Sequence, residues 1–357
     1  MIWLTWRQFR LQVSVIFAAV ASLAIAMAVT RPELLRAYHV DAIGFLNQIQ
    51  NDRVDKTLYL VGLALMYAAP PVIGAFWGAP LIARELEAGT HRLVWNQSTT
   101  RSRWLAIKLG LTGLAAMLAT GLLSLAVSWW SSPIDQAVAN GHSAGPFSFP
   151  RLFPVIYGAR GVVPIGCTAF AFALGVALGL ILRRSVPAIA ITLAAVIAVQ
   201  IAMPVAVRGH LIAPVQLTTT ITTSNFTGLH GNGPPDRGGK LQGFTVKPGK
   251  PSDWVMSNKT INSQGEVPNA LPAWVADCFL PTQGVVSQQG ETRAKAPSPR
   301  LLEGCFTRVA DAGFRQRVTY QPASRFWALQ WRETAILLTL AVLLTGFCFW
   351  RVRRDLS

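Results

Sequence analysis

Long apolar blocks separated by short polar segments make up most of the chain, and these blocks are apolar on all sides rather than striped. Each block is close to the roughly 20 residues that a helix needs to cross a bilayer. The predicted spans cover six blocks: residues 11–29, 57–83, 104–130, 161–182, 188–207 and 334–350. The pattern therefore predicts an all-α polytopic membrane protein with six transmembrane helices.

The composition agrees with the hydropathy pattern. Apolar residues make up 52% of the chain and charged residues only 13%, which is typical of a membrane protein rather than of a large soluble domain. The formal net charge is +16, but the basic residues form no aromatic-interleaved patch of the kind that a nucleic-acid groove requires. We therefore expect membrane lipid, and no nucleic acid, among the partners.

Basic residues are concentrated in the polar segment between the second and third spans. They are Arg84, Arg92, Arg101, Arg103 and Lys108. Short loops rich in Lys and Arg stay in the cytoplasm, and the segment after the last span is basic as well. Six spans then place both termini in the cytoplasm. We expect an extracytoplasmic domain at residues 208–332, followed by the sixth span and a cytoplasmic tail at residues 333–357.

The same cytoplasmic loop contains signals for the end of one helix and the start of another. Gly89 can end a helix in the left-handed conformation, and Thr90 can cap the free N–H groups of the next helix. The residues from His91 to Trp95 would then form one or two turns with apolar side chains and no lipid to cover them. So short a helix is marginally stable alone, which indicates that a partner protein binds it.

The residues Arg84-Glu85-Leu86-Glu87-Ala88-Gly89-Thr90, followed by Arg101 to Trp104 at the start of another span, resemble the cytoplasmic loop of ABC-2 type permeases. These proteins are the transmembrane subunits of bacterial ABC exporters, and their loop holds a coupling helix that docks on a separate ATPase subunit. In the loop at residues 84–103, the resemblance implies the following ATPase-coupling residues: Arg84, Glu85, Glu87, Gly89, Thr90, His91, Arg92 and Trp95.

The resemblance implies further properties. The spans at residues 11–207 would have a type V exporter-like arrangement, preceded by an interfacial connecting helix at residues 1–10, where Trp and Arg side chains suit the headgroup region. A second copy of the permease would complete a homodimer in the bacterial plasma membrane. ATP and Mg would bind to the ATPase partner, so no cofactor is expected on this chain.

The predicted spans lack the residues of a transporter that powers itself. No Asp, Glu, Lys, Arg or His lies in the middle of a span, whereas proton-driven transporters carry such residues there. The G-x-x-x-x-G-K-[ST] phosphate loop of an ATPase is absent. The histidines show no metal-ligand spacing. We expect no catalytic residue and no metal site, and an outside energy source for uphill transport.

The second and fifth spans contain the candidate residues of a substrate path. Pro70 and Pro71 interrupt the second span, and a proline inside a helix removes a hydrogen bond and kinks the helix. The kink has two interpretations, a bend for packing or a lining of the transport path. If it lines the path, the candidate residues are Tyr67, Pro70, Phe76, Trp77, Gln200 and Met203. The GVALG sequence of the fourth span favours close helix packing.

The segment at residues 208–332 is rich in Gly, Pro, Thr, Ser and Asn, and it predicts an α+β extramembrane domain. Expected strands lie at residues 218–223, 243–247 and 317–320, and an expected helix lies at residues 300–312. Cys278 and Cys305 fall in this segment, and an oxidising compartment favours a disulfide between them. The domain could serve as a lid, a substrate-handling surface or a docking platform.

These observations predict the transmembrane permease subunit of an ATP-driven ABC-2 exporter for a hydrophobic or amphipathic substrate. Two other interpretations remain open at this stage. The chain could be a non-transporting membrane sensor or scaffold whose outer domain signals through an ABC-type ATPase. It could also be a passive channel, which fits the uncharged spans but leaves the docking loop unexplained.

Overall fold

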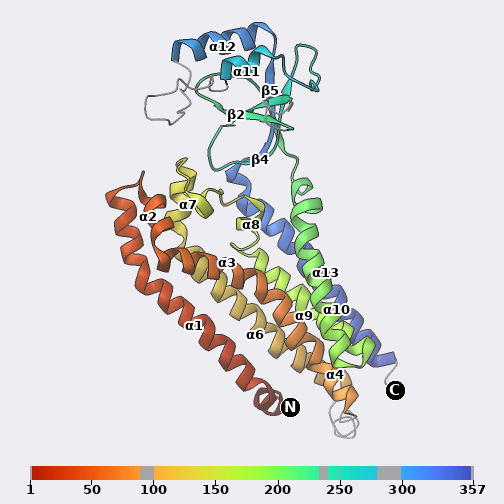
Figure 1. The fold of residues 1–357 in the computed structure, drawn as a ribbon. Coiled ribbons are helices and arrows are strands. Elements are labelled where there is room, and N and C mark those ends of the chain that lie inside the picture. The colour runs from red at the N-terminus through yellow and green to blue at the C-terminus, as the bar shows by residue number, and fades with distance from the viewer. Residues whose placement is uncertain (1, 89–99, 233–239, 248, 280–298, 355–357) are drawn as a thin grey trace, which may run out of the picture. The chain divides into compact units, whose positions relative to one another are not determined.

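The computed structural model describes residues 2–88, 100–232, 240–247, 249–279 and 299–354 (Figure 1). The chain divides into two units. One combines Met1–Ala213 with Ser324–Ser357, and the other is Pro214–Ala323.

The first unit is a bundle of long helices. They are α1 (Ile2–Val40), α3 (Arg53–Ile73) continued by α4 (Ala79–Glu87), α6 (Arg101–Trp130), α9 (Val163–Leu182), α10 (Ser185–Ala202) and α13 (Phe326–Arg354). Among the described residues, six helical segments are long and apolar enough to cross a membrane. This result confirms the predicted polytopic helical fold.

The helices extend beyond the apolar blocks that predicted them. α1 continues to Val40 rather than ending near residue 29, and α13 begins at Phe326 rather than near residue 334. Hydropathy marks only the part of a helix that suits lipid, and the backbone hydrogen bonds continue into the polar flanks. Residues 2–10, expected as a separate interfacial helix, are continuous with α1, because no Gly or Pro separates them from the first span.

Short elements connect the spans at the end of the bundle opposite to α4 (Figure 1). They are α2 (Phe45–Asn51), α7 (Ser132–Ala139), the 3₁₀ turn η2 (Gly145–Phe147) and α8 (Pro154–Tyr157). Phe45, Phe147 and Trp130 belong to one buried cluster there. The Trp130 indole N–H donates a hydrogen bond to Thr30 Oγ1 at 2.9 Å, which ties α6 to α1.

The span α9 lies at the centre of the bundle. It contacts α13, α4, α6, α10 and α3. In its most apolar window 72% of the residues are buried, against 6% in α1. α9 is therefore the helix around which the other spans pack, and α1 lies at the periphery.

In the described residues of the second unit there are two antiparallel sheets and two α-helices. The three-stranded sheet has the order β1 (Val215–Thr220), β5 (Arg315–Gln321) and β4 (Trp254–Ile261), and the other pairs β2 (Phe226–Gly231) with β3 (Leu241–Val246). The helices are α11 (Trp274–Phe279) and α12 (Pro299–Asp311). Phe244, Val318 and Val309 form the centre of the core.

The sequence predicted part of this unit. β1, β3, β5 and α12 overlap the predicted elements. β2 and β4 were missed, because β2 contains two glycines and half of the residues of β4 are polar. The disulfide between Cys278 and Cys305 is present and joins α11 to α12. Cys167 and Cys348 are free and buried within spans.

Candidate coupling region and polar cavity

The described start of the coupling loop is anchored to two other spans. Glu85, in α4, forms an ion pair with Lys108 of α6, whose side chain is almost fully buried. Glu87 Oε2 accepts hydrogen bonds from Ser185 Oγ at 2.9 Å and from the Ser185 backbone N–H at 3.2 Å. Because Ser185 begins α10, Glu87 satisfies one of the free N–H groups at the start of that helix. Arg84 is exposed.

Five predicted coupling residues cannot be placed. Gly89, Thr90, His91, Arg92 and Trp95 lie outside the described residues. The structure therefore locates the helix that leads into the loop, and the docking role of the loop stays a prediction.

The second span changes its helical form on the way to the loop. Gly74–Gly78 form a π-helical segment, η1, between α3 and α4. A Cβ on Gly74 would meet the Ala171 carbonyl oxygen at 2.6 Å, and a Cβ on Gly78 would meet the Phe172 carbonyl oxygen at 2.6 Å. The backbone of the second span thus lies directly against the backbone of α9 here.

The facing residues of α9 are glycines as well. A Cβ on Gly175 would overlap the Gly74 carbonyl oxygen, and a Cβ on Gly179 would overlap the carbonyl oxygen of Ala79. This geometry agrees with the close packing expected from the GVALG sequence. Because only glycine and alanine side chains lie at this contact, the backbones of η1 and α4 pack directly against the backbone of α9.

The hydrogen bond that Pro71 removes from the second span is replaced by a side chain of the fifth span. Pro71 has no N–H group, so it cannot donate to the carbonyl of Tyr67, four residues earlier. The Gln200 amide Nε2 donates to that carbonyl at 3.0 Å. This contact explains the one strongly polar residue of the fifth span. The fifth span has its own π-helical segment, η3, at Met203–Val207.

A small cavity of about 30 Å³ lies beside Pro70. Tyr67, Pro70, Gln200 and Met203 line it together with Arg208 and Glu333. Four of the six predicted path residues therefore meet at one place. The cavity is large enough for about one water molecule, so it holds no bulky substrate in this conformation.

The other two predicted path residues lie elsewhere. Phe76 is 54% exposed and Trp77 is buried in the cluster that contains Ile73 and Leu105. Both line a different, apolar pocket next to α1. The π-helical segment begins four residues after Pro70 and turns these side chains away from the polar cavity.

Arg208 and Glu333 form a buried ion pair that the sequence did not predict. The guanidinium of Arg208 contacts the Glu333 carboxylate through two hydrogen bonds, Nε to Oε2 at 2.9 Å and Nη2 to Oε1 at 3.0 Å. Both residues are at most 2% exposed. The sequence places Glu333 near the end of a span. It does not show that Glu333 pairs with Arg208, because the two residues lie far apart in the chain. The available signal was an arginine at the end of the fifth span that the predicted topology places outside, which is contrary to the positive-inside rule.

The ion pair also fixes the irregular segment between the third and fourth spans. Arg208 Nη1 donates to the Pro154 carbonyl at 2.9 Å, and the Tyr67 hydroxyl donates to the Val155 carbonyl at 2.8 Å. Gln330 Oε1, in α13, accepts from the N–H groups of residues 162 and 163 at 3.0 Å each. Side chains of three spans thus bind backbone groups of α8 and of the start of α9.

The comparisons agree with this architecture. Among the described residues, six helices long and apolar enough to cross a membrane support a multi-pass membrane protein. The family described as ABC-2 membrane transporter related matches residues 17–208, a little over half of the chain. The chain belongs to this family. No curated protein and no solved structure matches the chain.

Proposed function

We propose that this chain is the transmembrane permease subunit of an ATP-driven ABC-2 exporter. A separate ABC ATPase subunit binds the loop at residues 84–103, hydrolyses ATP with Mg, and thereby drives export of a hydrophobic or amphipathic substrate. Two copies of the permease form a homodimer in the bacterial plasma membrane. Both termini are cytoplasmic, and the domain at residues 208–332 is extracytoplasmic.

The anchoring of the coupling loop is the observation that carries the proposal. Glu85 joins the loop-bearing helix α4 to α6, and Glu87 joins it to α10. The glycine contacts join it to α9. A force applied to the loop by a partner protein therefore reaches the second, third, fourth and fifth spans together.

The polar cavity supports a role for the second and fifth spans in the substrate path. Both spans contain a π-helical segment, and α10 contacts α3, η1 and α4. π-helical segments occur frequently at functional sites. We propose that ATP-driven movement of α4 widens the space around Tyr67 and Gln200.

Purification of the chain from its native membrane, with identification of any ABC ATPase that accompanies it, tests the proposal. We expect the two proteins to co-purify and, in proteoliposomes, apolar compounds to stimulate ATP hydrolysis and to accumulate in the compartment opposite to the ATPase. Transport without any ATPase would overturn the proposal. Stimulated hydrolysis without accumulation of any compound would instead favour the sensor interpretation.

A further inference from the structure

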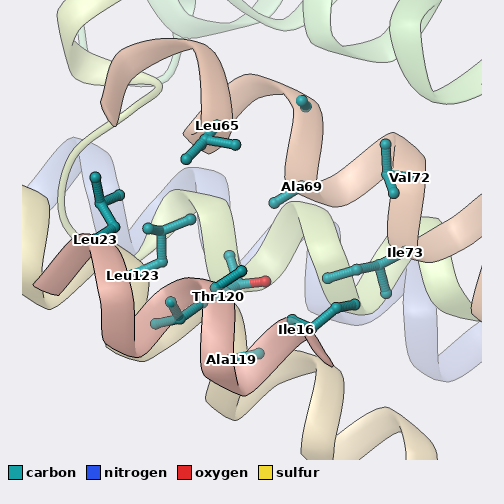
Figure 2. A pocket seen from close by; sticks show the side chains of 12 residues that line it. Ile16, Leu23, Leu65, Ala69, Val72, Ile73, Ala119, Thr120 and Leu123 are labelled. Carbon is teal, nitrogen blue, oxygen red and sulfur yellow. The ribbon is translucent and has the colours of Figure 1, made fainter. Parts of the chain in front are cut away.

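A continuous apolar groove runs between α1 and the second span. One part has a volume of about 200 Å³ and lies between α1, α3 and α6, as Figure 2 shows. A second part of about 360 Å³ extends toward the N-terminal end of α1. Ile16, Val72 and Ile73 line both parts, so the two parts are one groove.

The groove exists because α1 and α3 approach closely only at one end. There Gly62 allows contact, and a Cβ on it would lie 3.2 Å from the terminal methyl of Met27. Farther along, Ala19, Ala68 and Ala119 line the groove, and their side chains are too small to fill it. The gap is therefore a consequence of the sequence.

The lining restricts the chemistry of the occupant. In the first part of the groove, Thr120 supplies the polar side chain (Figure 2). Its hydroxyl donates to the Ala116 carbonyl at 3.1 Å and accepts from Thr168 at 3.0 Å, so its bonds are already made. Water needs two or more polar partners in such a site. The groove therefore suits hydrocarbon.

The length and the openings of the groove match one acyl chain. From Gln12 to Leu23 the axis of α1 rises by about 16 Å, close to the roughly 15 Å hydrocarbon depth of one leaflet. The rim residues Leu11, Val15 and Phe76 are exposed apolar side chains, so the groove opens toward lipid.

A polar atom lies at one end of the groove. Gln12 lines the second part, and its Oε1 is shielded from solvent with no hydrogen-bond partner among the described residues. A buried acceptor without a donor is costly. This end is near the start of the first span, where the headgroup of a lipid would lie.

We propose that this groove binds one acyl chain of a phospholipid from the leaflet at the N-terminal end of α1, and that the Gln12 side chain turns toward the groove so that a primary ammonium headgroup donates to its Oε1. Phosphatidylethanolamine has this donor, whereas the trimethylammonium group of phosphatidylcholine has no N–H. The proposal concerns a resident lipid, and it does not depend on the exporter proposal.

Native mass spectrometry of the full chain tests the proposal. The chain is reconstituted in nanodiscs containing equal amounts of phosphatidylethanolamine and phosphatidylcholine with identical acyl chains, then released into detergent. We expect one retained phospholipid, with phosphatidylethanolamine enriched about tenfold, the discrimination expected for one charge-assisted hydrogen bond. Equal retention of the two lipids, or no retained lipid, would overturn the proposal.

Variants separate the groove from the headgroup contact. Ala68→Leu fills the groove and should abolish lipid retention, whereas Ala64→Leu, one turn earlier on α3 and outside the groove lining, should retain it. Gln12→Leu should keep the lipid but lose the preference for phosphatidylethanolamine.

If Ala68→Leu does not fold, a second pair of variants gives the same test. Ala19→Leu fills the groove, and Ala18→Leu, outside the groove lining, is its control. Retention that is unchanged in a folded groove-filled variant would contradict the proposal. A shift of the monomer–dimer equilibrium with unchanged lipid would assign the groove to a second copy instead.

Discussion

The spans α9 and α1 belong to the same bundle but pack against the second span in different ways. α9 meets it backbone to backbone, with Gly175 and Gly179 facing the π-helical segment and α4. α1 meets it through side chains, and a groove remains between them. In the proposed mechanism, this difference decides which contact carries movement. The tight contact with α9 adjoins the helix that leads into the loop at residues 84–103, whereas the contact with α1 leaves a groove.

The largest expected loss of stability follows from breaking the buried ion pair between Arg208 and Glu333. Arg208→Met leaves the Glu333 carboxylate buried without its partner, and it should destabilise the protein by about 3–5 kcal/mol. Thermal unfolding in detergent measures the loss. The double variant Arg208→Met/Glu333→Leu should recover most of it, because replacing both partners by apolar groups is often neutral. If Arg208→Met were as stable as the wild type, the ion pair would contribute nothing to stability.

A smaller loss of stability is expected when the backbone contact between α9 and the second span is disturbed. Gly175→Ala adds one methyl group that overlaps the Gly74 carbonyl oxygen, and it should destabilise by about 1–3 kcal/mol. Gly110→Ala is the matched control, because nothing lies within 4 Å of its added Cβ. Ala68→Leu adds more volume on the α1 side, yet it should change stability little. Equal melting temperatures for Gly175→Ala and Gly110→Ala would remove the distinction between the two contacts.

The sequence revealed the spans better than the contacts between them. Six apolar blocks identify six helices because lipid exposure requires such blocks, and the two cysteines of one extramembrane segment identified the disulfide. The pairing of Arg208 with Glu333 depends on two helices that meet only in the folded bundle. The groove depends on alanines whose role appears only where α1 and α3 diverge.

The smallest loss of stability is expected when the contact between Gln200 and the second span is removed. Gln200→Leu removes the donor to the Tyr67 carbonyl and should destabilise by about 1 kcal/mol. Pro71→Ala restores a backbone N–H four residues after Tyr67, so the double variant Gln200→Leu/Pro71→Ala should regain that stability. Chemical denaturation of the two variants gives the comparison. If the double variant did not recover stability, Gln200 would not be replacing the hydrogen bond that Pro71 removes.

The coupling role of α4 is tested most directly by the number of substrate molecules transported per ATP hydrolysed in proteoliposomes. Glu87→Ala removes the bonds to Ser185, and its exposed side chain contributes little to stability. We predict that Glu87→Ala retains ATP hydrolysis but transports far less substrate per ATP, whereas Glu33→Ala, an exposed glutamate of α1, keeps the wild-type ratio. A wild-type ratio in Glu87→Ala would contradict the account.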